Sequence, residues 1–293
     1  MTTTHSLVRD GLGVKLSDGR TLGFAEFGDP RGSPMLYFHG GISCRLDMAF
    51  AAERAFERGI RIIAPDRPGT GLSDRLPDRT LTDWAIDVEE FLDQIELDKV
   101  ALFGWSLGSS YVFPCAHRIP ERFTRIATVG SCAMFDSPEY IEEMGLYLDR
   151  FLISCPPSFR WLMRTFLVLL GKAPAHMLKN EAEKEVSKSA SDLAVVRGMS
   201  YSDVTTMLNG SLFQGGDGVI DDYWAVREPW GFALNEILVD ITMFHGDEDT
   251  IAPLSGATRL SELIPGARLV SVPATGHFVQ HRKLDLIFDT LFN

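Results

Sequence analysis

The chain has 293 residues, of which 45% are hydrophobic and 23% are charged, which is the composition of a globular protein and not of a disordered, collagen-like or disulfide-rich chain. Its 40 acidic residues outnumber 28 basic ones and give a formal net charge of −12, the wrong sign for a nucleic-acid partner, whose phosphates are bound by Lys and Arg. The length allows two domains or one large α/β domain that carries an insertion.

The predicted elements begin with an antiparallel hairpin at the edge of a sheet. Residues 13–16 and 21–27 form its strands around the turn Ser17-Asp18-Gly19. Further along the chain, short apolar runs bounded by turn residues fit buried strands. These runs span residues 35–38, 60–64, 100–103, 125–129, 241–244 and 268–272.

Segments with helical periodicity lie between most of these strands. They span residues 46–58, 81–95, 107–118, 253–263 and 279–292, and Thr80 or Thr82 is the expected cap of the second. Strand and helix in alternation imply right-handed crossovers. The predicted fold is therefore α/β, with a mostly parallel twisted sheet and helices on both faces.

The alternation of strand and helix stops after Ser131 and resumes near Asp240. The intervening stretch is rich in Met and aromatic residues and is divided by Pro- and Gly-containing breaks, so we predict a helical cap, or lid, inserted between two strands of one sheet. The predicted boundaries are 1–132 for the first part of the core, 133–237 for the cap and 238–293 for the second part of the core.

Membrane insertion and secretion are not expected. The first residues, MTTTHSLVRDGLG, lack the apolar stretch of a signal peptide, which predicts a cytoplasmic protein. The most apolar window, 159–170, is interrupted by Arg160 and Arg164 and falls short of the ~20 residues of a membrane span, so it should be a buried or groove-lining helix. Cysteines without a C-x-x-C pair are expected to be buried thiols in a reducing compartment. They are Cys44, Cys115, Cys132 and Cys155.

The best candidate for a nucleophile is Ser106, at the centre of the G-x-S-x-G pattern formed by residues 104–108. The pattern directly follows a predicted strand and opens a predicted helix, which is the setting of a nucleophile elbow. The glycines two positions before and after the serine would leave room for a sharp, strained turn that exposes the hydroxyl.

A serine hydroxyl needs a neighbouring base, and His277 is the best placed of seven histidines. It follows the last predicted strand in a Gly-preceded loop and can reach over the carboxyl edge of the sheet. His281 is expected to be exposed or packed, and His245 to be buried and hydrogen-bonded. Ordinary surface or packing roles are expected for His5, His117 and His176.

The base in turn needs an acid that orients it, and Asp249 is the favoured candidate because it lies in the loop after a buried strand. Asp247 in the same turn and Asp136, after the strand that ends at Val129, remain alternatives. Donors for an oxyanion can come from the backbone N–H groups of Gly41, in the loop after an early strand, and Leu107.

The loop 66–74, DRPGTGLSD, contains two glycines but no phosphate-loop lysine, which argues against a nucleotide site. We expect it to be a hydrogen-bonded loop that supports the pocket.

Taken together, these motifs resemble the α/β-hydrolase superfamily over nearly the whole chain outside the predicted cap. HGG at 39–41, DRPGTGLSD at 66–74, GWSLG at 104–108, HGDEDTIAP at 245–253 and GHF at 276–278 appear in the order of that family. The resemblance implies Ser106 as nucleophile, His277 as general base and acid, Asp249 as its orienting carboxylate, and Gly41 and Leu107 as oxyanion donors. It also implies no metal and no organic cofactor.

Serine at the elbow, where the dehalogenase and epoxide-hydrolase branches have aspartate, favours acyl transfer, and the elbow GWSLG differs from the GGSWG typical of proline iminopeptidases. The sequence therefore predicts a serine hydrolase that cleaves a carboxylic ester, lactone or thioester of a small to medium hydrophobic substrate through an acyl-enzyme. A hydrolase-fold ligand-binding protein with little turnover and an acyltransferase remain alternatives. The natural substrate, movement of the lid and the oligomeric state, a homodimer included, stay open.

Overall fold

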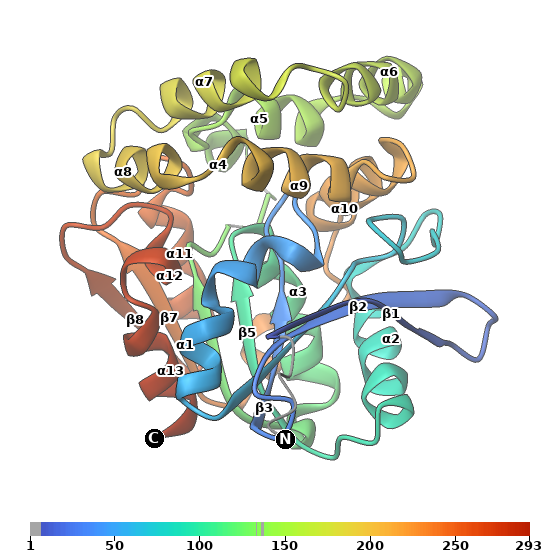
Figure 1. Ribbon diagram of the computed structural model, residues 1–293, viewed down its shortest axis with the longest axis vertical. Coiled ribbons are helices and arrows are strands. Elements are labelled where there is room, and N and C mark those ends of the chain that lie inside the picture. Colours follow the sequence, from blue (N-terminus) through green and yellow to red (C-terminus); the bar gives the residue numbers. More distant parts are fainter. Residues whose placement is uncertain (1–6, 133, 136–137) are drawn as a thin grey trace, which may run out of the picture.

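The computed structural model describes residues 7–132, 134–135 and 138–293, and a mostly parallel eight-stranded sheet lies at its centre (Figure 1). The strand order is β1-β2-β4-β3-β5-β6-β7-β8. β2 pairs antiparallel with β1 and β4, whereas the other neighbours pair in parallel. The strands are β1 (Val8–Lys15), β2 (Thr21–Gly28), β3 (Ser33–Phe38), β4 (Ile60–Pro65), β5 (Val100–Trp105), β6 (Phe123–Val129), β7 (Ile241–Gly246) and β8 (Ala267–Val272). The predicted edge hairpin and the six further predicted strands are all present, but the prediction that all six are buried is wrong for β8, an edge strand in which Val272 alone is buried.

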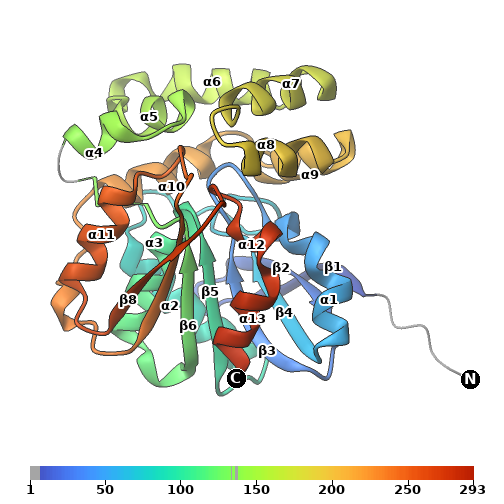
Figure 2. The same ribbon diagram turned by 90° about the vertical axis from the view of Figure 1, so that its left-hand side faces the viewer.

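Helices cover both faces of the sheet (Figure 2). One face carries α2 (Leu81–Gln94), α3 (Leu107–Arg118) and α11 (Leu254–Leu263), and the other carries the 3-10 turn η1 (Arg45–Ala51), α1 (Ala52–Glu57), α12 (Val279–Arg282) and α13 (Leu284–Phe292). The single helix predicted over 279–292 is wrong in one respect, because Lys283 has φ −136° and separates α12 from α13.

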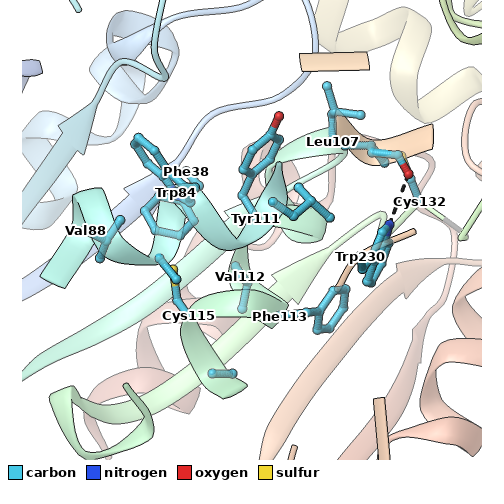
Figure 3. Close-up of a cluster of buried hydrophobic side chains, with 14 of the residues drawn as sticks. Phe38, Trp84, Val88, Leu107, Tyr111, Val112, Phe113, Cys115, Cys132 and Trp230 are labelled. Atoms are coloured by element: carbon cyan, nitrogen blue, oxygen red, sulfur yellow. Dashed lines mark hydrogen bonds between the residues drawn. The ribbon is translucent and has the colours of Figure 1, made fainter. Parts of the chain in front are cut away.

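Helix α2 shows how local sequence and packing position the site. Thr80, and not Thr82, caps the helix: its hydroxyl accepts the N–H of Asp83, and the Asp83 carboxylate accepts the N–H of Thr80 at 2.7 Å. The buried face of α2 presents Trp84, whose ring packs edge-on against Phe38 and Tyr111 (Figure 3). This aromatic cluster packs α3 against the sheet and thereby holds the turn that precedes Leu107, the first residue of α3, in place.

A layer of helices lies across the end of the sheet at which the parallel strands finish (Figures 1 and 2). The chain forms it between β6 and β7, as the interrupted alternation predicts. Its members are α4 (Pro138–Glu143), α5 (Tyr147–Ser154), the 3-10 turn η3 (Pro157–Phe159), α6 (Arg160–Leu170), α7 (Ala175–Glu185), α8 (Ala190–Gly198), α9 (Tyr201–Ser211) and α10 (Asp217–Arg227). Two further 3-10 turns precede the adjoining strands: η2 (Pro120–Arg122) lies before β6, and η4 (Leu234–Glu236) lies before β7.

The apolar window 159–170 contains the whole of α6, whose Met163 and Leu167 are buried and whose Phe166 and Leu170 line a cavity. The predicted groove-lining helix is confirmed. Within the described ranges, no helix has the length and apolar character that crossing a membrane requires. All four cysteines are free and buried, as expected.

Candidate active site

The turn between β5 and α3 holds Ser106 in a strained conformation, with φ 54° and ψ −128°. A Cβ atom on Gly104 would lie 2.5 Å from Val112 Cγ2, and one on Gly108 would overlap the backbone oxygen of Phe38. Only glycine therefore fits two residues before and after the serine, which agrees with the tight turn predicted from the pattern. The N–H of Ser106 donates to the carbonyl of Val129, the last residue of the neighbouring strand β6, at 2.8 Å, and this bond anchors the turn to the sheet.

His277 and Asp249 lie side by side at the ends of β8 and β7. The His277 Nδ1 atom is 2.8 Å from Asp249 Oδ2. The other carboxylate oxygen of Asp249 accepts the N–H groups of Ile251 and Ala252 at 2.8 and 3.0 Å, so the loop that begins α11 fixes the carboxylate. Trp105 donates its indole N–H to the carbonyl of His277 at 3.2 Å. The backbone and the ring of His277 are both held in place.

The electrostatics of this pair favour an ionised carboxylate beside the imidazole. Burial disfavours the charged form of His277, but the carboxylates of Asp249, Asp192 and Asp149 together outweigh burial and raise the pKa of the imidazole above its usual value. Burial likewise acts to raise the pKa of Asp249, but His277, His245 and the backbone N–H of Ile251 together outweigh it, so the pKa of this carboxyl is lowered. The pair can therefore hold a proton on the imidazole without protonating the acid.

The alternative acids and histidines lie elsewhere. Asp247 is exposed, and Asp136 lies outside the described residues, as does His5. The ring of His281 stacks on Phe50, His117 stacks on Phe232, and His176 is exposed. His245 is buried as expected, but the expected hydrogen bond is wrong: its Nε2 is 3.7 Å from Asp249 Oδ2, and neither ring nitrogen has a hydrogen-bond partner within the described ranges.

Ser106 and His277 line one cavity, and within the described part of the chain no hydrogen bond joins their side chains. A hydrogen bond between serine and base often forms only when substrate is bound, so this geometry is compatible with catalysis. Gly130, at the end of β6, leaves room for the imidazole, because a Cβ atom there would lie 2.8 Å from His277 Cε1.

The loop that carries Gly41 is held beside the start of α3 by a buried arginine. Arg67 donates to the carbonyl oxygens of His39 at 2.5 Å and Gly40 at 2.8 Å, and its Nε atom bonds to Asp222 of α10 at 2.9 Å. A Cβ atom on Gly41 would lie 3.5 Å from Leu107 Cβ, so the two predicted oxyanion donors are neighbours. The predicted supporting role of the loop 66–74 is confirmed, since Arg67 belongs to it.

The cavity has a volume of about 750 Å³ and lies between the sheet and the helical layer. Most of its lining is apolar and comes from α5 to α9. Its lining side chains with polar atoms are Trp105, Ser106, Tyr147, Asp149, Glu181, Glu185, Tyr223 and His277.

Two carboxylates from the helical layer reach this site, and the sequence analysis predicted neither of them. Asp192 of α8 accepts the backbone N–H groups of His277 and Phe278, and Asp149 of α5 accepts the Tyr223 hydroxyl. Each is an isolated acid within a helix, a pattern typical of an exposed surface position, and no motif surrounds either one. Only the folding of these helices over the sheet brings them to the site.

The comparison with known proteins agrees with this architecture. Residues 35–290 match the model of the alpha/beta hydrolase family. The chain is 26% identical over 270 residues to the uncharacterized hydrolase YcgS of Bacillus subtilis (strain 168), covering 89% of this chain and 90% of that protein. It is 27% identical over 256 residues to 2-hydroxymuconate semialdehyde hydrolase of Pseudomonas sp. (strain CF600), covering 85% and 82%.

Among solved structures, an esterase from Exiguobacterium antarcticum superposes with a TM-score of 0.68 at 20% identity, covering 96% of this chain and 97% of that one. At this identity the likeness concerns the fold alone. Because the family model covers most of the chain, the protein belongs to the alpha/beta hydrolase family. Hydrolase activity is supported by its relatives, which are hydrolases of several kinds.

Proposed function

We propose that the protein is a serine hydrolase that cleaves a carboxylic ester, with a lactone or thioester as chemically equivalent substrates. The observation that carries this proposal is the 2.8 Å contact between His277 Nδ1 and Asp249 Oδ2, beside a cavity that His277 shares with Ser106. A fixed carboxylate leaves the far nitrogen of the imidazole free to take a proton, which is the arrangement that activates a serine.

In the proposed reaction, His277 Nε2 removes the proton of the Ser106 hydroxyl while the oxygen attacks the substrate carbonyl carbon. The carbonyl oxygen becomes negative and accepts hydrogen bonds from the N–H groups of Gly41 and Leu107. Collapse of this tetrahedral intermediate breaks the bond to the alcohol, which takes the proton from His277. A water molecule, deprotonated by His277, then releases the acid and restores Ser106.

The helical layer between β6 and β7 is, in this proposal, a cap with the boundaries 133–237, flanked by the core parts 1–132 and 238–293. The apolar cavity beneath it supports a small to medium hydrophobic substrate, because a ligand of that kind buries most of its surface in such a pocket. The partner is thus a small molecule. The cytoplasmic location stays a prediction.

The test is the intact mass of the protein after exposure to a fluorophosphonate, followed by hydrolysis of p-nitrophenyl esters of increasing acyl length. We expect one adduct on the wild type and on Ser202→Ala, a control that removes an exposed serine, and none on Ser106→Ala. Absence of an adduct from folded wild type would contradict the proposal and favour the ligand-binding alternative. Product that carries the acyl group on an added alcohol would favour the acyltransferase.

A further inference from the structure

The side chains that line the cavity carry negative charge without a permanent positive one. Among the lining residues in the described part of the chain, Asp149, Glu181 and Glu185 are acidic and none is Lys or Arg. His277 is the one lining group in these ranges that can become positive, and it must be neutral to accept the serine proton. A substrate carboxylate in this cavity would therefore meet like charges only.

Of the three acids, Asp149 is the one beside the reacting groups. Its Oδ1 atom accepts the hydroxyl proton of Tyr223 at 2.6 Å. The Tyr223 hydroxyl in turn packs against the oxyanion loop so closely that a Cβ atom on Gly41 would overlap it. A Cβ atom on Gly41 would also lie 3.5 Å from Leu107 Cβ, so the Asp149–Tyr223 pair lies beside the two residues that carry the proposed oxyanion donors.

Asp149 is also poorly neutralised in the free protein. Burial raises its pKa to about 6, with the Tyr223 hydroxyl and His277 acting against burial and Glu185 adding to it. The carboxylate is therefore charged at neutral and alkaline pH. Within the described ranges its Oδ2 atom has no hydrogen-bond donor, although the residue faces the cavity.

A carboxylate near a developing oxyanion opposes the reaction, because like charges repel more strongly in a buried site than in water. A positive group on the substrate removes this repulsion and gives Asp149 Oδ2 the donor that it lacks. The repulsion between Asp149 and the oxyanion thus becomes a preference for substrates that carry a positive group.

We propose that Asp149 is a specificity-determining residue that selects esters carrying an ammonium group over neutral and carboxylate-bearing esters. This inference rests on the proposed function, since it concerns the same cavity and the same oxyanion position. Tyr223 holds the carboxylate in place through Oδ1 and leaves Oδ2 for the substrate.

The experiment compares p-nitrophenyl esters whose acyl chains end in dimethylammonium, isopropyl or carboxylate, which have similar shapes and differ in charge. A second series places the same groups on the alcohol side. The proteins are the wild type, Asp149→Asn, which can still accept the Tyr223 hydroxyl, and Glu142→Gln, which removes an exposed acid of α4 outside the cavity. The measurement is the ratio of kcat/KM for the ammonium ester to that for the isopropyl ester near pH 8, so general effects on folding cancel.

We expect this ratio to be above one, and equal in the wild type and Glu142→Gln, in at least one series. In Asp149→Asn we expect the ratio to be at least about tenfold lower than in the wild type. An unchanged ratio in Asp149→Asn, or a wild type without preference for the ammonium ester, would overturn the inference while leaving ester hydrolysis intact. Binding of the three esters to Ser106→Ala and to Ser106→Ala/Asp149→Asn by calorimetry gives the same comparison without turnover. If the wild type forms no fluorophosphonate adduct, the proposed function fails, and the calorimetric ratio still tests Asp149.

Discussion

The carboxylate of Asp192, in the helical layer, holds the backbone of His277, in the loop that follows the sheet. Oδ2 accepts the N–H of His277 at 2.8 Å, and Oδ1 accepts the N–H of Phe278 at 3.1 Å. Only glycine fits at position 276, because the same carboxylate occupies the space that a Cβ atom would need. Helix α8 is thereby fixed to the loop of the proposed base, so any movement of the helical layer that keeps this loop in place has to involve other helices.

Replacing Asp192 with Asn should impair catalysis through His277. The amide retains one acceptor of the two, and loss of a hydrogen bond to a charged group costs about 1.5–3 kcal/mol, or roughly ten- to a hundredfold in kcat/KM. Burial lowers the pKa of His277, whereas Asp249, Asp192 and Asp149 raise it, so the variant should have a lower imidazole pKa. Because the reaction needs the neutral imidazole, the acidic limb of the pH–rate profile should move to lower pH.

The matched control for Asp192→Asn is Ser189→Ala. Ser189 caps α8 and its hydroxyl accepts the N–H of Asp192 at 3.2 Å, so its loss should destabilise the same helix by about 1 kcal/mol. The carboxylate remains in this control, and the acidic limb should not move. A shift of equal size in both variants would show that Asp192 acts only through the stability of α8.

Replacing Asp249 with Asn should reduce kcat by about 10³- to 10⁴-fold, because the imidazole loses the carboxylate that orients it and stabilises its charged form. The pKa of His277, followed by NMR of the imidazole protons, should fall in the same variant. The control is Asp247→Asn, which changes an exposed carboxylate in the same turn and should keep the wild-type rate. Full activity of Asp249→Asn would assign the acid elsewhere.

Much of this arrangement could be predicted because it depends on short-range features. The turn at Ser106 is set by two glycines within two residues, and Asp249 and His277 lie in the loops that follow β7 and β8. A parallel sheet gathers the carboxyl ends of its strands at one edge, so strands far apart in the chain bring these residues together without further information.

The contributions of Asp149 and Asp192 could not be predicted, because they depend on how short helices pack over the sheet. Asp192 lies 85 residues before its partner His277, and Asp149 lies 74 residues before Tyr223. A single carboxylate in an amphipathic helix is satisfied equally well by water. The break at Lys283 was missed for a related reason, since 279–292 has continuous helical periodicity.

Gly130→Ala should displace the imidazole of His277. Gly130 has φ +57°, so alanine strains the backbone by about 1–2 kcal/mol, and its methyl carbon would lie 2.8 Å from His277 Cε1. Moving a catalytic group by about 1 Å can cost a hundredfold in rate, and we expect a loss in kcat/KM of that order. Gly59→Ala is the control, because Gly59 has φ +62° and nothing within 4 Å of a Cβ atom. Similar activity in the two variants would mean that the space at Gly130 is not needed by the base.

Arg67→Met should weaken both the fold and the loop that carries the proposed oxyanion donor Gly41. The guanidinium is buried, and its loss leaves Asp222 with fewer donors and the carbonyl oxygens of His39 and Gly40 with none from this side chain. Breaking a buried pair from one side costs about 3–5 kcal/mol, which urea denaturation would report as a lower midpoint. Arg118→Met removes an exposed ion pair with Glu89 and should change the free energy of unfolding by at most about 1 kcal/mol. If the folded Arg67 variant retains wild-type kcat at low urea, then Arg67 supports the fold and not the geometry at Gly41.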